Sequence, residues 1–315
     1  MKKCLHSLLK CALISSFFLT LHFASFSQLS AGNYLEGGIV VAPMGFLGDL
    51  GGHFGKGTTF LKDYNMNTTK LSFGIAVTAH PSEWLGFRVA LNYGGVSGDD
   101  ANISTKSDGI EQARRNRNLN FRSNIYEGFI AGELYPTVFF ENDPTDVQGR
   151  LRPYGLLGIG VFHFNPQGTD WNGDWVDLQP LHTEGQGIVA GKKPYALTQM
   201  NIPMGVGVKY YFTDNLNIAF ELIHRKTFTD YIDDVSTTFV DPSVFTGPNA
   251  TLSSYMSNKS PLRGVPNSGY NPGDKRGDPH QNDAYFTMGF KLGIRLVSKS
   301  TAEWRNSTHC PVLRF

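Results

Sequence analysis

The chain has 315 residues, of which 17% are charged and 13% aromatic, and its formal net charge at pH 7 is +1. A near-neutral chain argues against a nucleic-acid-binding protein, because such proteins carry a basic excess. The 35 glycines, with many aromatic and few charged residues, are typical of an all-β protein rich in turns.

The first segment predicts export. Three lysines among the first ten residues lead into an apolar stretch at 11–26, and small side chains at Ser25 and Ser27 fit a cleavage site after Ser27. We therefore expect residues 1–27 to be a secretory signal peptide. Its removal leaves 288 residues with 25 basic and 27 acidic side chains.

The remaining chain has few means of stabilisation other than burial. Cys310 is its one cysteine, so no internal disulfide is expected. No later stretch reaches 18 consecutive apolar residues, and the sequence therefore predicts no membrane-spanning helix. Stability must come from a buried core or from a barrel closed within lipid.

Eight β-strands are predicted in the remaining chain. Their expected ranges are 33–42, 71–80, 84–93, 121–135, 153–164, 201–212, 215–226 and 285–297. The last strand alternates strictly, with apolar side chains at every even position from Phe286 to Leu296 and Lys291 and Arg295 on the other face. Successive side chains of a strand point to opposite faces. One face is therefore wholly apolar, as in a soluble sandwich or in a membrane barrel with a polar lumen.

Three further strands show the same alternation. In 84–93, 201–212 and 215–226, apolar residues line one face and small or charged residues the other. Strands 33–42 and 153–164 are rich in glycine, and their faces cannot be assigned.

The lengths of the connections decide between sandwich and barrel. Long connections at 43–70, 94–120, 165–200 and 227–284 alternate with shorter ones, such as 81–83 and 213–215. Long outer loops alternating with short periplasmic turns are typical of outer-membrane barrels. We therefore predict a transmembrane antiparallel β-barrel of about eight strands, OmpA-like and up-and-down, over 28–297, with a periplasmic tail at 298–315.

Aromatic residues near the strand ends predict two interfacial girdles. The inner girdle would contain Trp84, Tyr135, Tyr154, Tyr210 and Phe212, and the outer girdle Tyr93, Phe162, Phe164 and Tyr285.

The faces opposite the apolar ones define the expected lumen. They place five cations and three carboxylates inside the barrel: Arg88, Lys209, Arg225, Lys291, Arg295, Glu127, Glu133 and Glu221. An eight-stranded barrel is just wide enough to be filled by its side chains, and buried charges require partners. We predict a charged network that plugs the barrel, and hence a scaffold rather than a diffusion pore.

One acidic segment is a candidate ion site. Asp230, Asp233, Asp234 and Ser236 follow His224 closely in sequence, and clustered carboxylates suit calcium. The segment lacks the spacing and glycine of an EF-hand, so a turn-rich loop base is the favoured interpretation.

Other candidate residues carry weaker signals. A hydrolase built from His182 with Glu184 or Asp233 is conceivable, but no G-x-S-x-G motif is present. Asp49 lies in a glycine-rich run without a phosphate-loop lysine, and Cys310 reads as a free thiol. We assign no catalytic, cofactor-binding or metal-binding residue and expect no cofactor and no enzymatic activity.

Several strings resemble one protein family. They are GFLGDLGG (45–52), RNLNFRSNIYE (117–127), PYGLLGIGVFHFNPQ (153–167), DLQPLHTEGQG (177–187), KPYALTQMNIPMGVGVKYYF (193–212) and ELIHRKTFTDYIDDVSTTF (221–239). Together these strings resemble the PorG-like outer-membrane barrels of the type IX secretion system.

The resemblance implies a structural component without catalysis in the outer membrane of a Gram-negative bacterium. Such a barrel anchors the periplasmic ring of the lipoprotein PorK and its partner PorN. Strings 177–187 and 227–239 fall in loops expected outside the cell, which does not suit a periplasmic partner. A surface adhesin or receptor barrel acting through loops 165–200 and 227–284 is the alternative, followed by an outer-membrane hydrolase.

Overall fold

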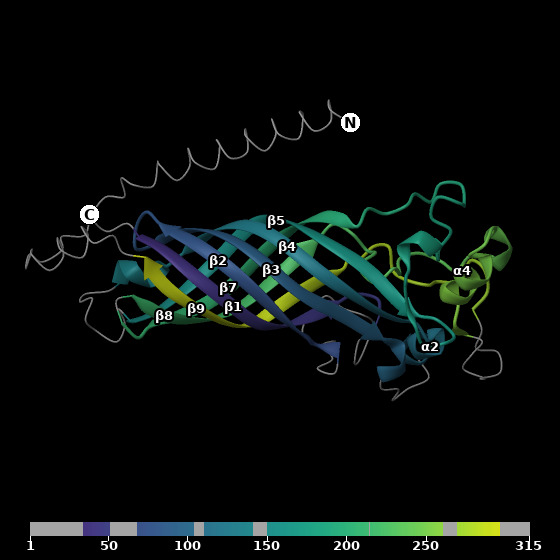
Figure 1. Cartoon of the computed structure of the whole chain (residues 1–315), viewed down its shortest axis with the longest axis horizontal. Coiled ribbons are helices and arrows are strands. Elements are labelled where there is room, and N and C mark those ends of the chain that lie inside the picture. Colours follow the sequence, from purple (N-terminus) through teal and green to yellow (C-terminus); the bar gives the residue numbers. More distant parts are fainter. Residues whose placement is uncertain are drawn as a thin grey trace, which may run out of the picture.

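The computed structural model describes residues 34–50, 68–103, 110–140, 150–213, 215–260 and 270–296. The predicted signal peptide at 1–27, the tail at 298–315 and Cys310 lie outside the described residues. Eight long strands form a closed antiparallel β-barrel (Figure 1), which confirms the predicted fold class.

The barrel strands are β1 (Tyr34–Leu47), β2 (Lys70–His80), β3 (Leu85–Asp99), β4 (Asn120–Leu134), β5 (Leu151–Thr169), β7 (Thr198–Tyr211), β8 (Leu216–Thr227) and β9 (Ala284–Leu296). A short strand, β6 (Trp175–Asp177), lies outside the barrel wall. The helices are α2 (Ile110–Arg117) and α4 (Ala250–Ser257), with 3-10 turns at Asp100–Asn102, Pro136–Phe140, Gln179–Leu181 and Pro242–Val244. No helix within the described ranges is long and apolar enough to cross a membrane.

Each barrel strand pairs antiparallel with its neighbours along the chain, and β1 closes the barrel on β9. Closure leaves no unpaired barrel edge, which a lipid environment requires because unsatisfied backbone groups are costly there. The small β6 pairs with the outer end of β5, where Gln167 lies opposite Asp177.

The predicted strand count is confirmed, but three strands are longer than expected. β1, β3 and β5 continue five or six residues beyond the predicted outer ends at 42, 93 and 164. The strand β6 was not predicted and occupies part of the expected loop 165–200.

The outward faces carry the apolar side chains, as predicted for 84–93, 201–212, 215–226 and 285–297. On β5, apolar or small outward-facing residues run from Leu151 to Val161, after which His163 begins a polar stretch. Ten residue steps span about 33 Å along a strand, or roughly 25 Å across the membrane at the usual tilt. That is the height of the apolar band of transmembrane barrels.

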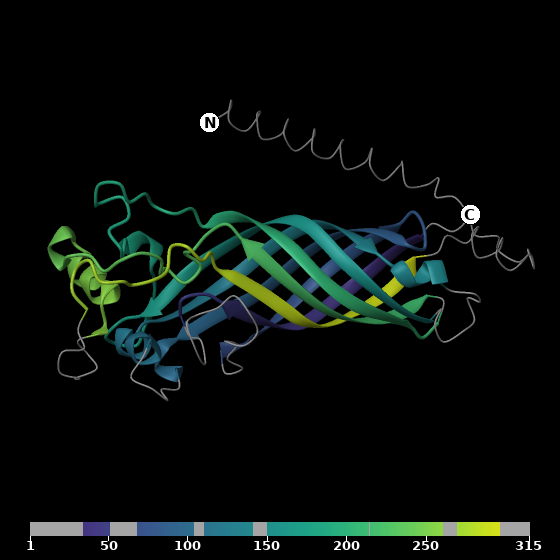
Figure 2. The same ribbon diagram turned by 180° about the vertical axis from the view of Figure 1, so that it is seen from behind.

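The two ends of the barrel differ. The short connections gather at one end, and the described parts of the long connections at the other (Figures 1 and 2). We call the described residues of 100–119, 170–197 and 228–283 the cap. Both α2 and α4 belong to it (Figure 1).

The girdle prediction is partly wrong. Trp84, Phe212 and Tyr93 are exposed on the outer surface. In contrast, five residues assigned to the girdles are buried inside the molecule: Tyr135, Tyr154, Phe162, Phe164 and Tyr285. Tyr154, Phe162 and Phe164 occupy inward positions of β5, the glycine-rich strand whose faces the sequence did not reveal.

Candidate functional site: the sealed lumen and the cap

The lumen near the short turns holds a layer of paired charges. The Arg88 guanidinium donates to both oxygens of Glu221, with N–O distances of 3.0 and 2.7 Å, and its Nε pairs with Glu133. A bidentate arginine–carboxylate pair is among the strongest polar contacts in proteins. Tyr154 and Tyr135 donate further hydrogen bonds to Glu221 and Glu133.

Glu36 connects the two lysines of this layer. Its Oε2 lies 2.9 Å from Lys209 Nζ, and its Oε1 lies 3.0 Å from Lys291 Nζ. Asn217 donates to the same carboxylate at 3.0 Å. Sequence reasoning missed Glu36 because the adjacent Gly37 and Gly38 obscure the alternation of β1.

A second polar layer lies nearer the cap and centres on Glu127. Arg225 Nη2 lies 3.2 Å from Glu127 Oε2, and Asn201 and Tyr285 donate to Oε1 at 2.7 and 3.0 Å. Asn92 donates to Oε2 at 2.9 Å. The carboxylate is therefore satisfied from four strands, as buried charge requires.

Little free space separates the two layers. A cavity of about 10 Å³ lies between them, lined by Arg88, Glu221 and Arg225 among others. That is room for about one water molecule. The predicted luminal position is confirmed for all eight named charges, since Arg295 lies opposite inward-facing Glu36, and seven of the eight belong to these two layers. The eighth, Arg295, lies near the turn end of β9 with its guanidinium 3.6 Å from the Tyr34 ring centroid.

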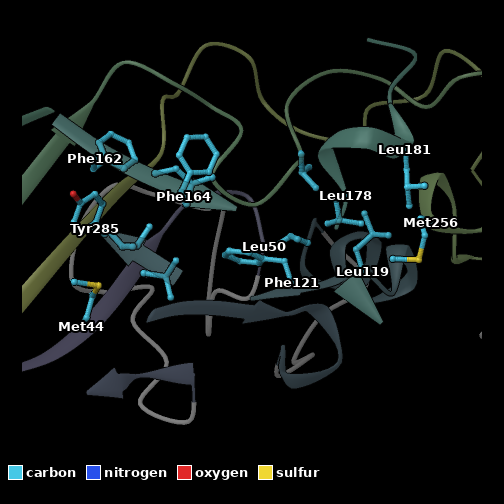
Figure 3. Packing of buried hydrophobic residues seen from close by; sticks show 14 residues of the cluster. Met44, Leu50, Leu119, Phe121, Phe162, Phe164, Leu178, Leu181, Met256 and Tyr285 are labelled. Atoms are coloured by element: carbon cyan, nitrogen blue, oxygen red, sulfur yellow. The ribbon is translucent and has the colours of Figure 1, made fainter. Parts of the chain in front are cut away.

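An apolar core continues the seal from the barrel into the cap (Figure 3). Met44, Phe162 and Tyr285 come from barrel strands, and Leu181 and Met256 come from the cap. The core holds 14 buried residues, more than any other apolar cluster of the described chain, so the cap and the outer barrel end are packed as one body.

Charged side chains tie the segments of the cap together. Glu184 accepts the backbone N–H groups of Ser236 and Thr237 at 2.9 and 3.0 Å. Arg276 donates to Glu184 Oε1 at 3.0 Å and lies 3.7 Å from Asp234. Strings 177–187 and 227–239, which carry part of the family resemblance, therefore fold against each other.

Four acidic residues meet where the ends of β1, β8 and β9 enter the cap. Asp233 accepts the backbone N–H of Leu50 at 2.9 Å, and Asp283 accepts that of Ile232 at 2.8 Å. Asp49 accepts the N–H of Asp278 at 2.6 Å. Asp230 is 7% exposed, and neither of its carboxylate oxygens has a hydrogen-bond partner of good geometry among the described residues.

Burial of these carboxyls shifts their titration. It raises the pKa of Asp230 to about 9, helped by the negative charges of Asp233 and Asp49. Burial, followed by the neighbouring carboxylates, also raises the pKa of Asp233 and of Asp283. For Asp234, burial outweighs the attraction of Arg276 and raises the pKa to about 6. The cluster therefore holds protons more readily than exposed aspartates do.

The structure does not assemble the candidate calcium site. His224 lies on the outward face of β8, whereas Asp230 and Asp233 are buried in the cap. Asp234 binds the hydroxyls of Tyr195 and Thr183 instead. Within the described ranges, no three His, Cys, Asp or Glu side chains are arranged to hold a metal ion.

The residues of the conceivable hydrolase are engaged in structural contacts. Glu184 and Asp233 bind backbone N–H groups of the cap, as given above. His182 adopts a left-handed conformation (φ 52°) that ends a 3-10 turn, and its Nδ1 has no hydrogen-bond partner among the described residues.

Comparison with solved structures finds small outer-membrane barrels. Ail of Yersinia pestis matches with 9% identity and a TM-score of 0.37, over 85% of this chain and 100% of that one. Neisserial surface protein A matches with 11% identity and a TM-score of 0.33, over 84% and 97% of the two chains. The N-terminal barrel of Pseudomonas aeruginosa OprF matches with 10% identity and a TM-score of 0.31, over 83% of this chain and 97% of that one. Similarities at this level carry no functional information.

No curated protein matches the sequence. The family model described as a domain of unknown function, DUF6089, matches residues 14–240, which is more than half of the chain. The chain therefore belongs to the DUF6089 family.

Proposed function

We propose that this protein is a structural barrel of a bacterial outer membrane that transports no solute through its lumen. The observation that carries the proposal is the sealed interior, with two charge layers and an apolar core in series. The predicted signal peptide and the apolar outer band support the location, since closed β-barrels are characteristic of outer membranes.

We further propose a specific role for this barrel. It would act in the type IX secretion system, as PorG-like proteins do, and anchor the periplasmic ring of PorK and PorN. Its support is the resemblance of strings such as 153–167 and 193–212. A sealed barrel also suits an anchor, because an anchor must hold a partner without leaking. The candidate catalytic side chains Glu184 and Asp233 are bonded within the cap, which favours a structural role over an enzymatic one.

Deletion of the gene and assay of secreted proteins tests the secretion role. We expect loss of type IX cargo from the medium while other outer-membrane proteins assemble normally. Complementation with the intact chain should restore export. Unimpaired export in the deletion strain would refute the anchor proposal.

The second candidate is a surface adhesin or receptor barrel, and the folded cap favours it. The cap has its own ion pairs and shares an apolar core with the barrel, so it offers a rigid surface rather than flexible loops. Loss of adhesion or ligand binding in the deletion strain, with export intact, would select this function over the anchor.

A further inference from the structure

The sheet of β4, β5 and β6 extends above the apolar band and presents a polar outer face. Arg122 lies opposite Gln167, and Gln167 lies opposite Asp177, in paired strands. Val176, between Trp175 and Asp177, packs inward against the apolar core of the cap. The outer face is therefore rigid sheet and not a loop.

Side-chain contacts hold this face in a fixed arrangement. The Arg122 guanidinium lies 4.3 Å from the centroid of the Trp175 ring, and its Nε donates to Gln167 Oε1 at 3.0 Å. Asp177 Oδ1 accepts from Asn165 and Gln167 at 2.9 and 2.8 Å. We call Arg122, Asn165, Gln167, Trp175 and Asp177 the polar sheet face.

Several groups on the polar sheet face are available to bind a ligand. Trp175 is 38% exposed. Among the described residues, neither Asp177 Oδ2 nor the terminal nitrogens of Arg122 have a hydrogen-bond partner. An exposed aromatic ring beside fixed donors and acceptors suits a sugar, whose C–H face packs on the ring while its hydroxyls pair with the polar groups. The terminal nitrogens of Arg122, which the contacts with Trp175 and Gln167 leave available, also suit phosphate.

The distance of the polar sheet face from the apolar band indicates which kind of lipid could reach it. The apolar band ends where Tyr126 pairs with His163. Arg122 is four residues further along β4, and Trp175 pairs with Thr169, six residues beyond His163. At a tilt of about 40°, these residues lie roughly 10–15 Å above the band. A phospholipid headgroup layer reaches only about 5–8 Å.

We propose that the polar sheet face binds the phosphorylated saccharide headgroup of an outer-leaflet glycolipid. The lipid's acyl chains would cover Tyr126 and Val161 on the adjoining apolar wall, so that one molecule contacts both surfaces. The inference rests on the outer-membrane location in the proposed function, but not on a role in secretion.

The test measures binding of rough-type lipopolysaccharide to the purified full chain in detergent, by microscale thermophoresis. We expect Trp175→Ala and Arg122→Ala each to weaken binding by about tenfold or more. The matched control is Lys226→Ala, an exposed, outward-facing cation at the outer end of β8, which should bind as the unchanged protein does. Heat-dependent gel mobility verifies that each variant is folded.

Two competitors identify what is bound. Phospholipid micelles should not displace the lipopolysaccharide, and its delipidated oligosaccharide should bind far more weakly than the intact lipid. Unchanged affinity in both Trp175→Ala and Arg122→Ala would overturn the proposal. Equal affinity for the free oligosaccharide would overturn the assignment to a membrane lipid. Normal export in the deletion strain would refute the secretion role and leave this binding result unaffected.

Discussion

At the scale of single residues, Asp230 makes the cap sensitive to alkali. Its pKa is raised from 3.8 to about 9 in the folded protein. Between these pH values the folded state holds a proton that the unfolded state has released, so stability falls as pH rises through this window. The slope attributable to one carboxyl is at most about 1.4 kcal/mol per pH unit.

We predict that Asp230→Asn flattens this dependence, because a neutral amide needs no proton to remain uncharged. Urea unfolding of the cap, followed by tryptophan fluorescence between pH 5 and 9, should show a gain in stability that grows with pH. Asp241→Asn, at an exposed cap carboxyl, is the control and should leave the slope unchanged. An equal slope in Asp230→Asn and the unchanged protein would contradict the prediction.

Glu36 gives a second prediction at this scale. Glu36→Gln removes the carboxylate that lies 2.9 Å from Lys209 and 3.0 Å from Lys291. Breaking a buried pair by removing one partner typically costs 3–5 kcal/mol, because a buried charge remains uncompensated. Denaturant titration of the folded barrel by gel mobility measures the loss. Glu83→Gln, whose carboxylate is 39% exposed beside Arg152, should cost about 0–1 kcal/mol.

At the scale of elements, strict alternation made strands easy to predict and glycine made their faces hard to read. β9 carries an apolar side chain at every second position, and β8 does so from Leu216 to Leu222, so the alternation of side chains along each strand reveals its lipid face and its lumen face. β1 and β5 interrupt that pattern with glycines, which concealed luminal Glu36 and Tyr154.

The cap could not be predicted from local sequence. Its central contact joins Arg276 to Glu184, 92 residues apart in the chain, and neither neighbourhood indicates the other. The short strand β6 forms because β5 extends past the apolar band to provide a pairing edge. The composition of 165–200 therefore indicated a long loop, whereas pairing with β5 makes part of this segment a strand.

The prediction at the scale of elements concerns the lipid-facing side of β9. Phe290 is exposed on the outer wall and packs edge-on against Phe220, with ring centroids 5.3 Å apart. Phe290→Arg places a charge in the apolar band, at a cost of about 2–4 kcal/mol near the bilayer midplane. Phe290→Leu, the control, loses only the aromatic pair, worth about 0.5–1.5 kcal/mol. The folded fraction after insertion into lipid vesicles distinguishes them, and equal folding of both variants would show that Phe290 does not face lipid.

At the scale of the whole molecule, the lumen is closed by barriers in series. The turn end has the layer of Arg88 and Glu221, and the cap end has the layer of Glu127 and Arg225 beneath an apolar core. In a series arrangement, removing one barrier leaves the other in place. Substitutions that open a single barrier should therefore leave ion conduction unchanged.

We therefore predict that the unchanged protein shows no steady nanosiemens-scale conductance in planar bilayers. Replacing Arg88 and Glu221 together with serine removes one cation and one carboxylate, so the net charge of the layer does not change, and Glu133 keeps Lys291 within 4.0 Å. The barrel should remain closed because the Glu127 layer is intact. Replacing Glu127 and Arg225 alone should give the same result. The fourfold variant should also show no steady conductance, because the apolar core is a further barrier in series and remains intact. Open channels in either double variant would show that a single layer forms the seal, and open channels in the unchanged protein would refute the scaffold interpretation.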